Sequence, residues 1–194
     1  MDEQTTDLFH AMIKRCLSQE VAPFYDEWEA AGEIPRSLWH SLGAAGLLGI
    51  DLDEQHGGSG ADIAITQLAL EEFSRQGFGG LASAYNIHAN IVMPYLQNLG
   101  TETQCTRWLP AMARGESLGA IAMTEPHAGS DLASMKTRAK RTSDGWELSG
   151  SKIFITNGQF ADLVIVCAKT DPSAGAKGVS LFLVDTRLPG FSRG

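Results

Sequence analysis

The sequence predicts an α+β fold, in which an all-helical domain over residues 1–116 is followed by an antiparallel β-sandwich or barrel-like domain over residues 117–194. Two observations predict this order. Up to about residue 115 the apolar residues recur every three or four positions, as on one face of a helix. Beyond it, short β-branched or aromatic runs alternate with turn residues. Since no long helical stretch separates these runs, an antiparallel sheet is favoured over a parallel nucleotide-binding sheet.

Two helices are predicted near the amino terminus. The first begins at Thr5 and is kinked or ended by Pro23, because proline interrupts helical hydrogen bonding. The second follows Pro35, a residue suited to the first turn of a helix. Its apolar stripe consists of Leu38, Trp39 and Leu42. The glycine-rich stretch HGGSG, residues 56–60, then predicts a loop.

Polar residues mark the starts of the later helices. Asp62 is placed to cap a helix that runs to Gln76 and turns Glu72 toward water. Residues 81–99 form a long apolar segment, which we expect to be buried. Thr101 and Gln104 have the capping-box spacing, which predicts a further helix that ends near residue 114.

Short strands are predicted in the second domain. The runs are LGAIAM, KTRAKRT, WELSG, KIFIT, DLVIVCAKT and GVSLFLVD, at residues 118–123, 136–142, 146–150, 152–156, 162–170 and 178–185. Asp144 and Gly145 predict a two-residue hairpin turn between the second and third runs. Residues 170–178 are rich in turn formers and predict an exposed loop.

The charge and composition exclude several classes of function. Residues 1–116 hold 6 basic and 16 acidic side chains, and residues 117–194 hold 9 and 7, which sum to the net charge of -8. Without a basic cluster, a nucleic-acid partner is not expected. The 3 cysteines have no CxxC pair, and no histidine lies at ligand spacing, so neither a disulfide framework nor a metal site is predicted. No basic leader or apolar run of about 20 residues predicts a targeting segment or a membrane span.

Two motifs of enzymes occur in the wrong structural setting. GESLG at residues 115–119 matches the hydrolase nucleophile pattern, but that pattern needs a strand before Ser117 and a helix after it. Here the predicted order is reversed, so we interpret the motif as a helix-to-strand turn. GFGGLA at residues 77–82 fits a dinucleotide fingerprint, but a charged helix end precedes it where a strand is required. A helix-to-helix connection explains it better.

The stretch AMTEPHAGSD, residues 122–131, concentrates groups that expose the backbone or form hydrogen bonds. Pro126 halts strand pairing, and Gly129 permits a backbone path that other residues resist. Amides freed in this way, with the hydroxyls of Thr124 and Ser130, would form a donor-rich pocket for an anionic or heteroaromatic ligand. A tight loop stabilised by its own side chains is the alternative that these residues alone leave open.

A family resemblance decides between these alternatives. AMTEPHAGSDLAS resembles the signature of the acyl-CoA dehydrogenase family, and GSKIFITNG at residues 150–158 resembles its second flavin-contacting segment. EVAPFYDEWEAAGEIPRSLWHSLGAAGLLGI and KGVSLFLVDTRLPGF match as well, so the resemblance covers essentially the whole chain and looks closest to the long-chain branch. It implies a helical domain and a β domain, with a carboxy-terminal helical domain that this chain lacks.

The resemblance implies an FAD site on two segments. Its cofactor-binding residues would be Ile121, Ala122, Met123, Thr124, Gly129, Ser130, Phe154, Ile155 and Thr156. Ser130 would also bind the acyl-pantetheine arm of the substrate. Two departures bear on affinity or redox tuning: His127 stands where a small residue is common, and Phe154 replaces a frequent tryptophan.

The implied reaction is α,β-dehydrogenation of a fatty acyl-CoA to a trans-2-enoyl-CoA. A carboxylate base removes the α-proton while the β-hydride passes to FAD. In this family the base is a glutamate of the carboxy-terminal domain, so no catalytic residue is expected in this chain, and Glu125 is interpreted as a structural loop residue. An acyl-CoA oxidase, a flavin monooxygenase or a non-catalytic flavin or acyl-CoA binding module are the alternatives.

The resemblance also implies partners and a location. Electron-transferring flavoprotein is the usual electron acceptor in the family, and a homodimer or homotetramer is the usual assembly. The expected location is the cytoplasm of a bacterium or the mitochondrial matrix of a eukaryote.

Overall fold

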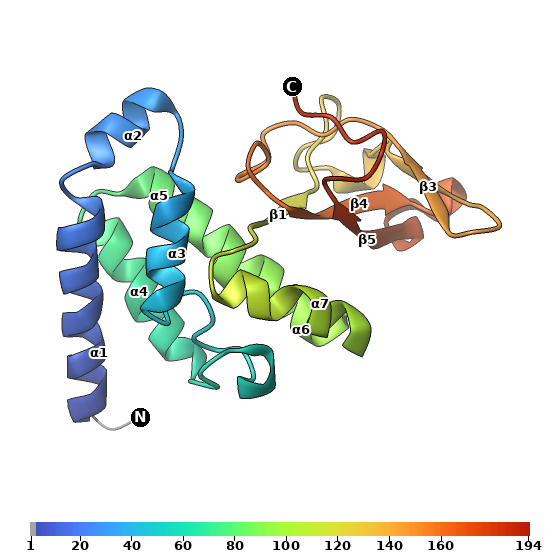
Figure 1. The fold of residues 1–194 in the computed structure, drawn as a ribbon. Coiled ribbons are helices and arrows are strands. Elements are labelled where there is room, and N and C mark those ends of the chain that lie inside the picture. The colour runs from blue at the N-terminus through green and yellow to red at the C-terminus, as the bar shows by residue number, and fades with distance from the viewer. Residues whose placement is uncertain (1–2) are drawn as a thin grey trace. The chain divides into compact units, whose positions relative to one another are not determined.

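The computed structural model describes residues 3–194, and the chain divides into two compact units between Leu118 and Gly119. The first unit is helical and runs from blue to green in Figure 1. Its α-helices are α1 (Glu3–Cys16), α2 (Tyr25–Ala31), α3 (Arg36–Ala44), α4 (Ile63–Arg75), α5 (Gly79–Tyr85), α6 (Met93–Leu99) and α7 (Glu102–Ala113). The second unit, from yellow to red, contains a sheet.

The core of the helical unit consists of large side chains from α3, α4 and α5. Trp39, Phe73 and Tyr85 are almost fully buried. The rings of Phe73 and Tyr85 stack with centroids 4.7 Å apart, and the Tyr85 hydroxyl donates to the Leu47 carbonyl at 2.8 Å. Helix α1 packs on α4, and α6 packs on α7. Burial of these apolar surfaces is the main stabilising contribution in this unit.

The predicted caps and the break at Pro23 are confirmed, but the first helix begins at Glu3 rather than at Thr5. The helical path from α1 continues through a π-helical turn, Leu17–Val21, and breaks around Pro23 before α2 begins. Asp62 caps α4 by accepting from the Ala64 amide at 2.8 Å. Thr101 and Gln104 form the capping box of α7. The apolar segment 81–99 is divided into α5, a π-helical stretch Asn86–Val92 and α6.

The prediction that Glu72 faces water is wrong. Its side chain is buried where α1 packs on α4, with Oε2 3.0 Å from His10 Nε2. The Gln76 side-chain amide donates to Oε1 at 2.9 Å. Burial raises the pKa of Glu72, but the hydrogen bonds from Gln76 and His10, with the nearby Lys14 charge, outweigh it and lower that pKa. A charged side chain on a helix can therefore be buried when other side chains form hydrogen bonds with it.

The second unit is built on a five-stranded mixed sheet. Strand β4 pairs along its length with β5, antiparallel, and on its other edge with β1 and then β2, both parallel. Strand β3 extends the sheet as an antiparallel hairpin with β2. The strands are β1 (Gly119–Ala122), β2 (Arg138–Arg141), β3 (Trp146–Ser149), β4 (Leu163–Lys169) and β5 (Val179–Asp185). Because β1 and β2 share one edge of β4, the residues between them leave the sheet and return to the same edge.

The order of helices and then strands is confirmed, but the sheet is mixed rather than wholly antiparallel. The parallel pairing of β1 with β4 is possible because the long connection between them, residues 123–162, includes the β2–β3 hairpin and needs no helix. The hairpin turn lies one residue earlier than predicted. Its central pair is Ser143 and Asp144, since the Thr142 amide donates to the Gly145 carbonyl at 3.0 Å.

The predicted strand at residues 152–156 does not form. Phe154 and Asn157 have positive φ values of 57° and 64°, which no strand accommodates. The segment is instead a loop that leads to a turn, in which the Gly158 amide donates to the Ile155 carbonyl at 2.9 Å. This loop contains the second predicted site segment.

Candidate functional site

The structure brings the two predicted site segments together. The Ile153 amide donates to the Thr124 carbonyl at 3.0 Å, and the Lys152 ammonium donates to the Met123 carbonyl at 2.9 Å. The Ile155 side chain packs on a core cluster that includes Ala120 and Ala122. Residues far apart in the sequence therefore form one continuous surface at the end of β1.

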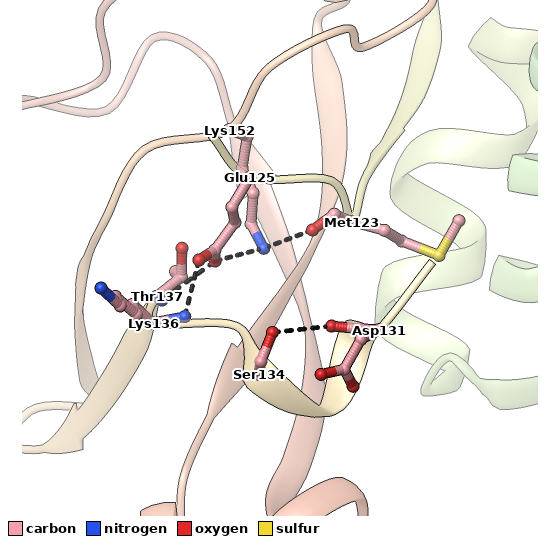
Figure 2. Close-up of polar contacts among 7 residues, drawn as sticks. All are labelled: Met123, Glu125, Asp131, Ser134, Lys136, Thr137 and Lys152. Carbon is pink, nitrogen blue, oxygen red and sulfur yellow. Dashed lines mark hydrogen bonds and ion pairs between the residues drawn. The ribbon is translucent and has the colours of Figure 1, made fainter. Parts of the chain in front are cut away.

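The first segment makes a tight turn directly after β1. The Glu125 amide donates to the Ala128 carbonyl at 2.8 Å, and the Ala128 amide donates back to the Glu125 carbonyl at 3.1 Å. Pro126 and His127 therefore form the exposed tip of the turn. A short 3₁₀ helix follows, and the Ser134 hydroxyl donates to the Asp131 carbonyl at 2.9 Å, as Figure 2 shows.

Several donors on this surface have no protein partner. Within residues 3–194, no hydrogen bond uses the amides or hydroxyls of Thr124 and Thr156, or the amides of Gly129 and Ser130. Gly129 and Ser130 are exposed, and the two threonines are half-buried. Donors that are exposed in this way bond to water in the free protein, so they are available to a ligand that is rich in hydrogen-bond acceptors.

Gly129 has a different role from the predicted one. Its φ is not in the left-handed region, so its backbone path does not require glycine. A Cβ atom built at this position would meet no heavy atom of the described chain within 4 Å. The missing side chain leaves the backbone open to close approach from outside, which is a second use of glycine at binding sites.

Phe154 is an outlier in both conformation and exposure. Its φ is 57° and its side chain is 87% exposed. A left-handed conformation costs a non-glycine residue about 1–2 kcal/mol, and an exposed aromatic ring gains little from packing. Such strain is typical of ligand-binding positions. The sequence predicted a strand here, and no residue of FIT signals the positive φ.

The other predicted residues contribute mainly backbone or apolar contact. Ile121 and Ala122 are buried in β1, so a ligand at this surface would meet their main chain rather than their side chains. Met123 is 36% exposed at the end of the strand, and Ile155 is half-buried on the core cluster already described.

Glu125 lies at the centre of the polar contacts in Figure 2. Its side chain is 3% exposed. Oε2 accepts from the Lys136 amide at 2.6 Å, and Oε1 accepts from the Thr137 amide and the Lys152 ammonium, both at 2.9 Å. Burial raises the pKa of Glu125, but hydrogen bonds from Lys136, Thr137 and Lys152 outweigh it and lower the pKa to about 2. A carboxylate so stabilised is a weak base.

Sequence reasoning missed two residues of the site. Lys152 joins both segments. In the sequence, the only indication of this role is that a charged residue stands directly before an apolar run. Asn157 adopts positive φ and its side-chain amide donates to the Gly119 carbonyl at 3.2 Å, which ties the second segment to the start of β1. The Asn-Gly pair at residues 157 and 158 is a turn signal that could have indicated it.

Comparisons with known proteins identify the family of this chain. Residues 3–116 match the model of the acyl-CoA dehydrogenase N-terminal domain, and residues 120–194 match that of the middle domain. The long-chain specific acyl-CoA dehydrogenase of Rattus norvegicus mitochondria is 46% identical over 97% of this chain, which covers 44% of that protein. The chain thus spans less than half the length of that relative.

Two solved structures extend the comparison. An acyl-CoA dehydrogenase from Geobacillus kaustophilus superposes with a TM-score of 0.94 at 43% identity, over all of this chain and 51% of that one. A glutaryl-CoA dehydrogenase from Mycobacterium smegmatis in complex with FADH2 has a TM-score of 0.89 at 32% identity, over 99% and 48%. In the described part of this chain, no helix has the length and apolar character to cross a membrane. The chain belongs to the acyl-CoA dehydrogenase family, of which it contains the N-terminal and middle domains.

Proposed function

We propose that this chain supplies the flavin-facing half of an FAD-dependent acyl-CoA dehydrogenase that converts a fatty acyl-CoA to a trans-2-enoyl-CoA. One observation carries the proposal. Unpaired donors from two distant segments converge beside an exposed aromatic ring held in a strained conformation. The complex of the Mycobacterium smegmatis relative with FADH2 supports FAD as the ligand.

The residues present fit FAD by their chemistry. Thr124 and Thr156 offer amides and hydroxyls to the acceptors at the polar edge of the flavin ring, and Gly129 and Ser130 offer amides to the pyrophosphate. The exposed Phe154 ring offers an apolar face to a planar ligand. The open space at Gly129 allows backbone atoms to approach the ligand directly.

When bound, FAD supplies the acceptor for the hydride that leaves the substrate β-carbon. The donors of Thr124 and Thr156 would stabilise negative charge on the reduced flavin, and little reorganisation would be needed because the two segments are already joined. The α-proton goes to a carboxylate outside this chain. Glu125 does not serve as that base, since its oxygens are engaged by two amides and one ammonium group.

The relatives support a proposal for the substrate and the partners. Similarity to the long-chain specific enzyme supports a long-chain acyl-CoA as substrate. Electron-transferring flavoprotein is proposed as the acceptor and a homodimer or homotetramer as the assembly. The catalytic base is proposed to lie in a carboxy-terminal helical domain, so the coding sequence downstream of Gly194 should specify amphipathic helices with a candidate glutamate.

The test is anaerobic reduction of the complete protein that contains this chain. Butyryl-, octanoyl- and palmitoyl-CoA are added in turn, the flavin absorbance is followed, and the product is identified by mass spectrometry. We expect bleaching that is fastest with palmitoyl-CoA, a trans-2-enoyl product, and slow reoxidation by oxygen. Rapid reoxidation by oxygen would support an oxidase instead, and no bleaching with any thioester would contradict the proposal.

Substitutions link the reaction to this surface. Thr124→Ala and Thr156→Ala each remove one hydroxyl of the site, and we expect each to weaken FAD binding. Thr142→Ala is the matched control, because Thr142 lies exposed in the β2–β3 hairpin. Equal FAD affinity in all three variants would contradict the placement of the cofactor.

A further inference from the structure

Lys152 connects three stretches of the β unit. Its side chain is 11% exposed, and its ammonium group donates to the Met123 carbonyl and to Glu125 Oε1, each at 2.9 Å. Glu125 in turn accepts from the amides of Lys136 and Thr137. Figure 2 shows the Lys152 and Glu125 side chains meeting each other and backbone groups from separate parts of the chain. A further contact joins the same stretches, because a Cβ atom at Gly150 would overlap Thr137.

Glu125 holds together the two ends of a loop. This loop, residues 126–135, lies within the connection from β1 to β2, and the Glu125 carboxylate at its start accepts from the Lys136 amide at its end at 2.6 Å. Ala128 and Met135 anchor the loop on Cys167 of β4. The exposed amides of Gly129 and Ser130 belong to this loop. The loop that carries those donors is therefore held by its packing on β4 as well as by Glu125.

Lys152 also determines the direction of one peptide group. In a trans peptide the C=O and the N–H point to opposite sides. Because Lys152 holds the Met123 carbonyl, the Thr124 N–H of the same peptide points away from Lys152. This N–H has no partner among the hydrogen bonds of residues 3–194. Without the ammonium group, nothing described holds the Met123 carbonyl in place.

We propose that Lys152 is a positioning residue of the flavin site, which orients the Met123–Thr124 peptide and joins the two cofactor-binding segments. The inference rests on the proposed function, since the ligand of the oriented N–H is FAD. A purely stabilising role would not require a charge here, because apolar residues often replace a buried ion pair without loss of stability. Holding a carbonyl, by contrast, requires a donor.

The test compares variants of the complete protein. Lys152→Met removes the donor, whereas Glu125→Gln removes the negative charge and one acceptor oxygen but keeps Lys152 and one acceptor oxygen. Each breaks the same buried ion pair, so we expect similar falls in the thermal unfolding midpoint. Lys140→Met is the matched control, because Lys140 is an exposed lysine of β2. FAD affinity and the flavin midpoint potential are measured for each protein.

We expect Lys152→Met to weaken FAD binding at least about tenfold, and Glu125→Gln to stay within about threefold of the wild type. Loss of a donor at the polar edge should weaken reduced FAD about tenfold more than oxidised FAD in Lys152→Met, a fall of about 30 mV in potential. Equal loss of FAD affinity in both variants, or no effect in Lys152→Met beyond the Lys140→Met control, would overturn the proposal. Should Lys152→Met fail to fold, a tenfold loss in Glu125→Gln would still overturn it, and retention would support it.

Failure of the proposed function is distinguishable from failure of this inference. A wild-type protein that takes up no FAD contradicts the proposed function. Hydrogen exchange of the cofactor-free protein then tests whether Lys152 orients the Met123–Thr124 peptide. Faster exchange over residues 119–125 in Lys152→Met, and not in Lys140→Met, supports the orientation of this peptide by Lys152, and unchanged exchange contradicts it.

Discussion

The two units of the chain treat their polar groups in opposite ways. In the helical unit, Asp62 and Thr101 satisfy the first amides of their helices, and the buried Glu72 and Tyr85 both have partners. In the β unit, two segments leave amides and hydroxyls unpaired and hold Phe154 exposed with a positive φ. These groups of the helical unit stabilise its fold, whereas the β unit retains strain and free donors at the surface where we propose that FAD binds.

Removal of a core side chain from the helical unit should have the largest effect on stability. Trp39 is 1% exposed, and Trp39→Ala leaves a large cavity in its place. We expect a loss of about 3–5 kcal/mol in the free energy of unfolding, measured by urea denaturation with helical circular dichroism. A loss below about 1 kcal/mol would contradict the description of this core.

The next largest effect should be the contribution of the buried Glu125 carboxylate to the stability of the β unit. Its pKa is lowered from 4.5 to about 2, so its contribution is fully present above about pH 4.5 and is lost as the pH falls toward 2. The contribution is about 3 kcal/mol. Glu125→Gln should remove this part of the acid dependence of the urea midpoint. Glu147→Gln on β3 is the exposed control, and equal flattening by both variants would contradict a special role for Glu125.

Phe154→Gly should move stability and binding in opposite directions. Glycine adopts positive φ without steric cost, so the free energy of unfolding should rise by about 1 kcal/mol. FAD binding should weaken, because the exposed ring is lost. Isothermal titration with FAD and urea denaturation of the same variant measure both effects. Parallel changes in the two quantities would show that Phe154 serves the fold rather than a ligand.

The smallest effect should come from a helix cap. Thr101→Ala removes the side-chain acceptor for the Gln104 amide, which should cost about 1 kcal/mol. FAD affinity should be unchanged, because the cap belongs to the unit without the proposed flavin residues. A change in FAD affinity comparable to that of Phe154→Gly would break the division of roles between the units.

Local signals predicted the helical unit well. Helix caps and breaks depend on residues that are close in the sequence, so they can be predicted from it. Examples are the caps at Asp62 and Thr101 and the break at Pro23. Glu72 was assigned to water because its partner His10 lies in another helix, which no local pattern reveals. Contacts between distant segments are the part of the fold that residue spacing does not encode.

The same limit applies to the β unit and its site. The parallel pairing of β1 and β4 depends on the path of a long connection, and an antiparallel sheet was predicted from the absence of helices. The two site segments were identified by family resemblance, yet their junction through Lys152 and the left-handed Phe154 emerged from the structure. A run such as KIFIT favours a strand by composition, and tertiary contacts override that preference.

Hydrogen exchange of the complete protein with and without FAD tests the central claim most directly. We expect FAD to slow exchange in peptides that cover residues 121–130 and 154–156, while peptides from α4 exchange at the same rate in both states. Protection confined to the helical unit, or no protection at either segment when FAD is bound, would contradict the assignment of this surface to the flavin.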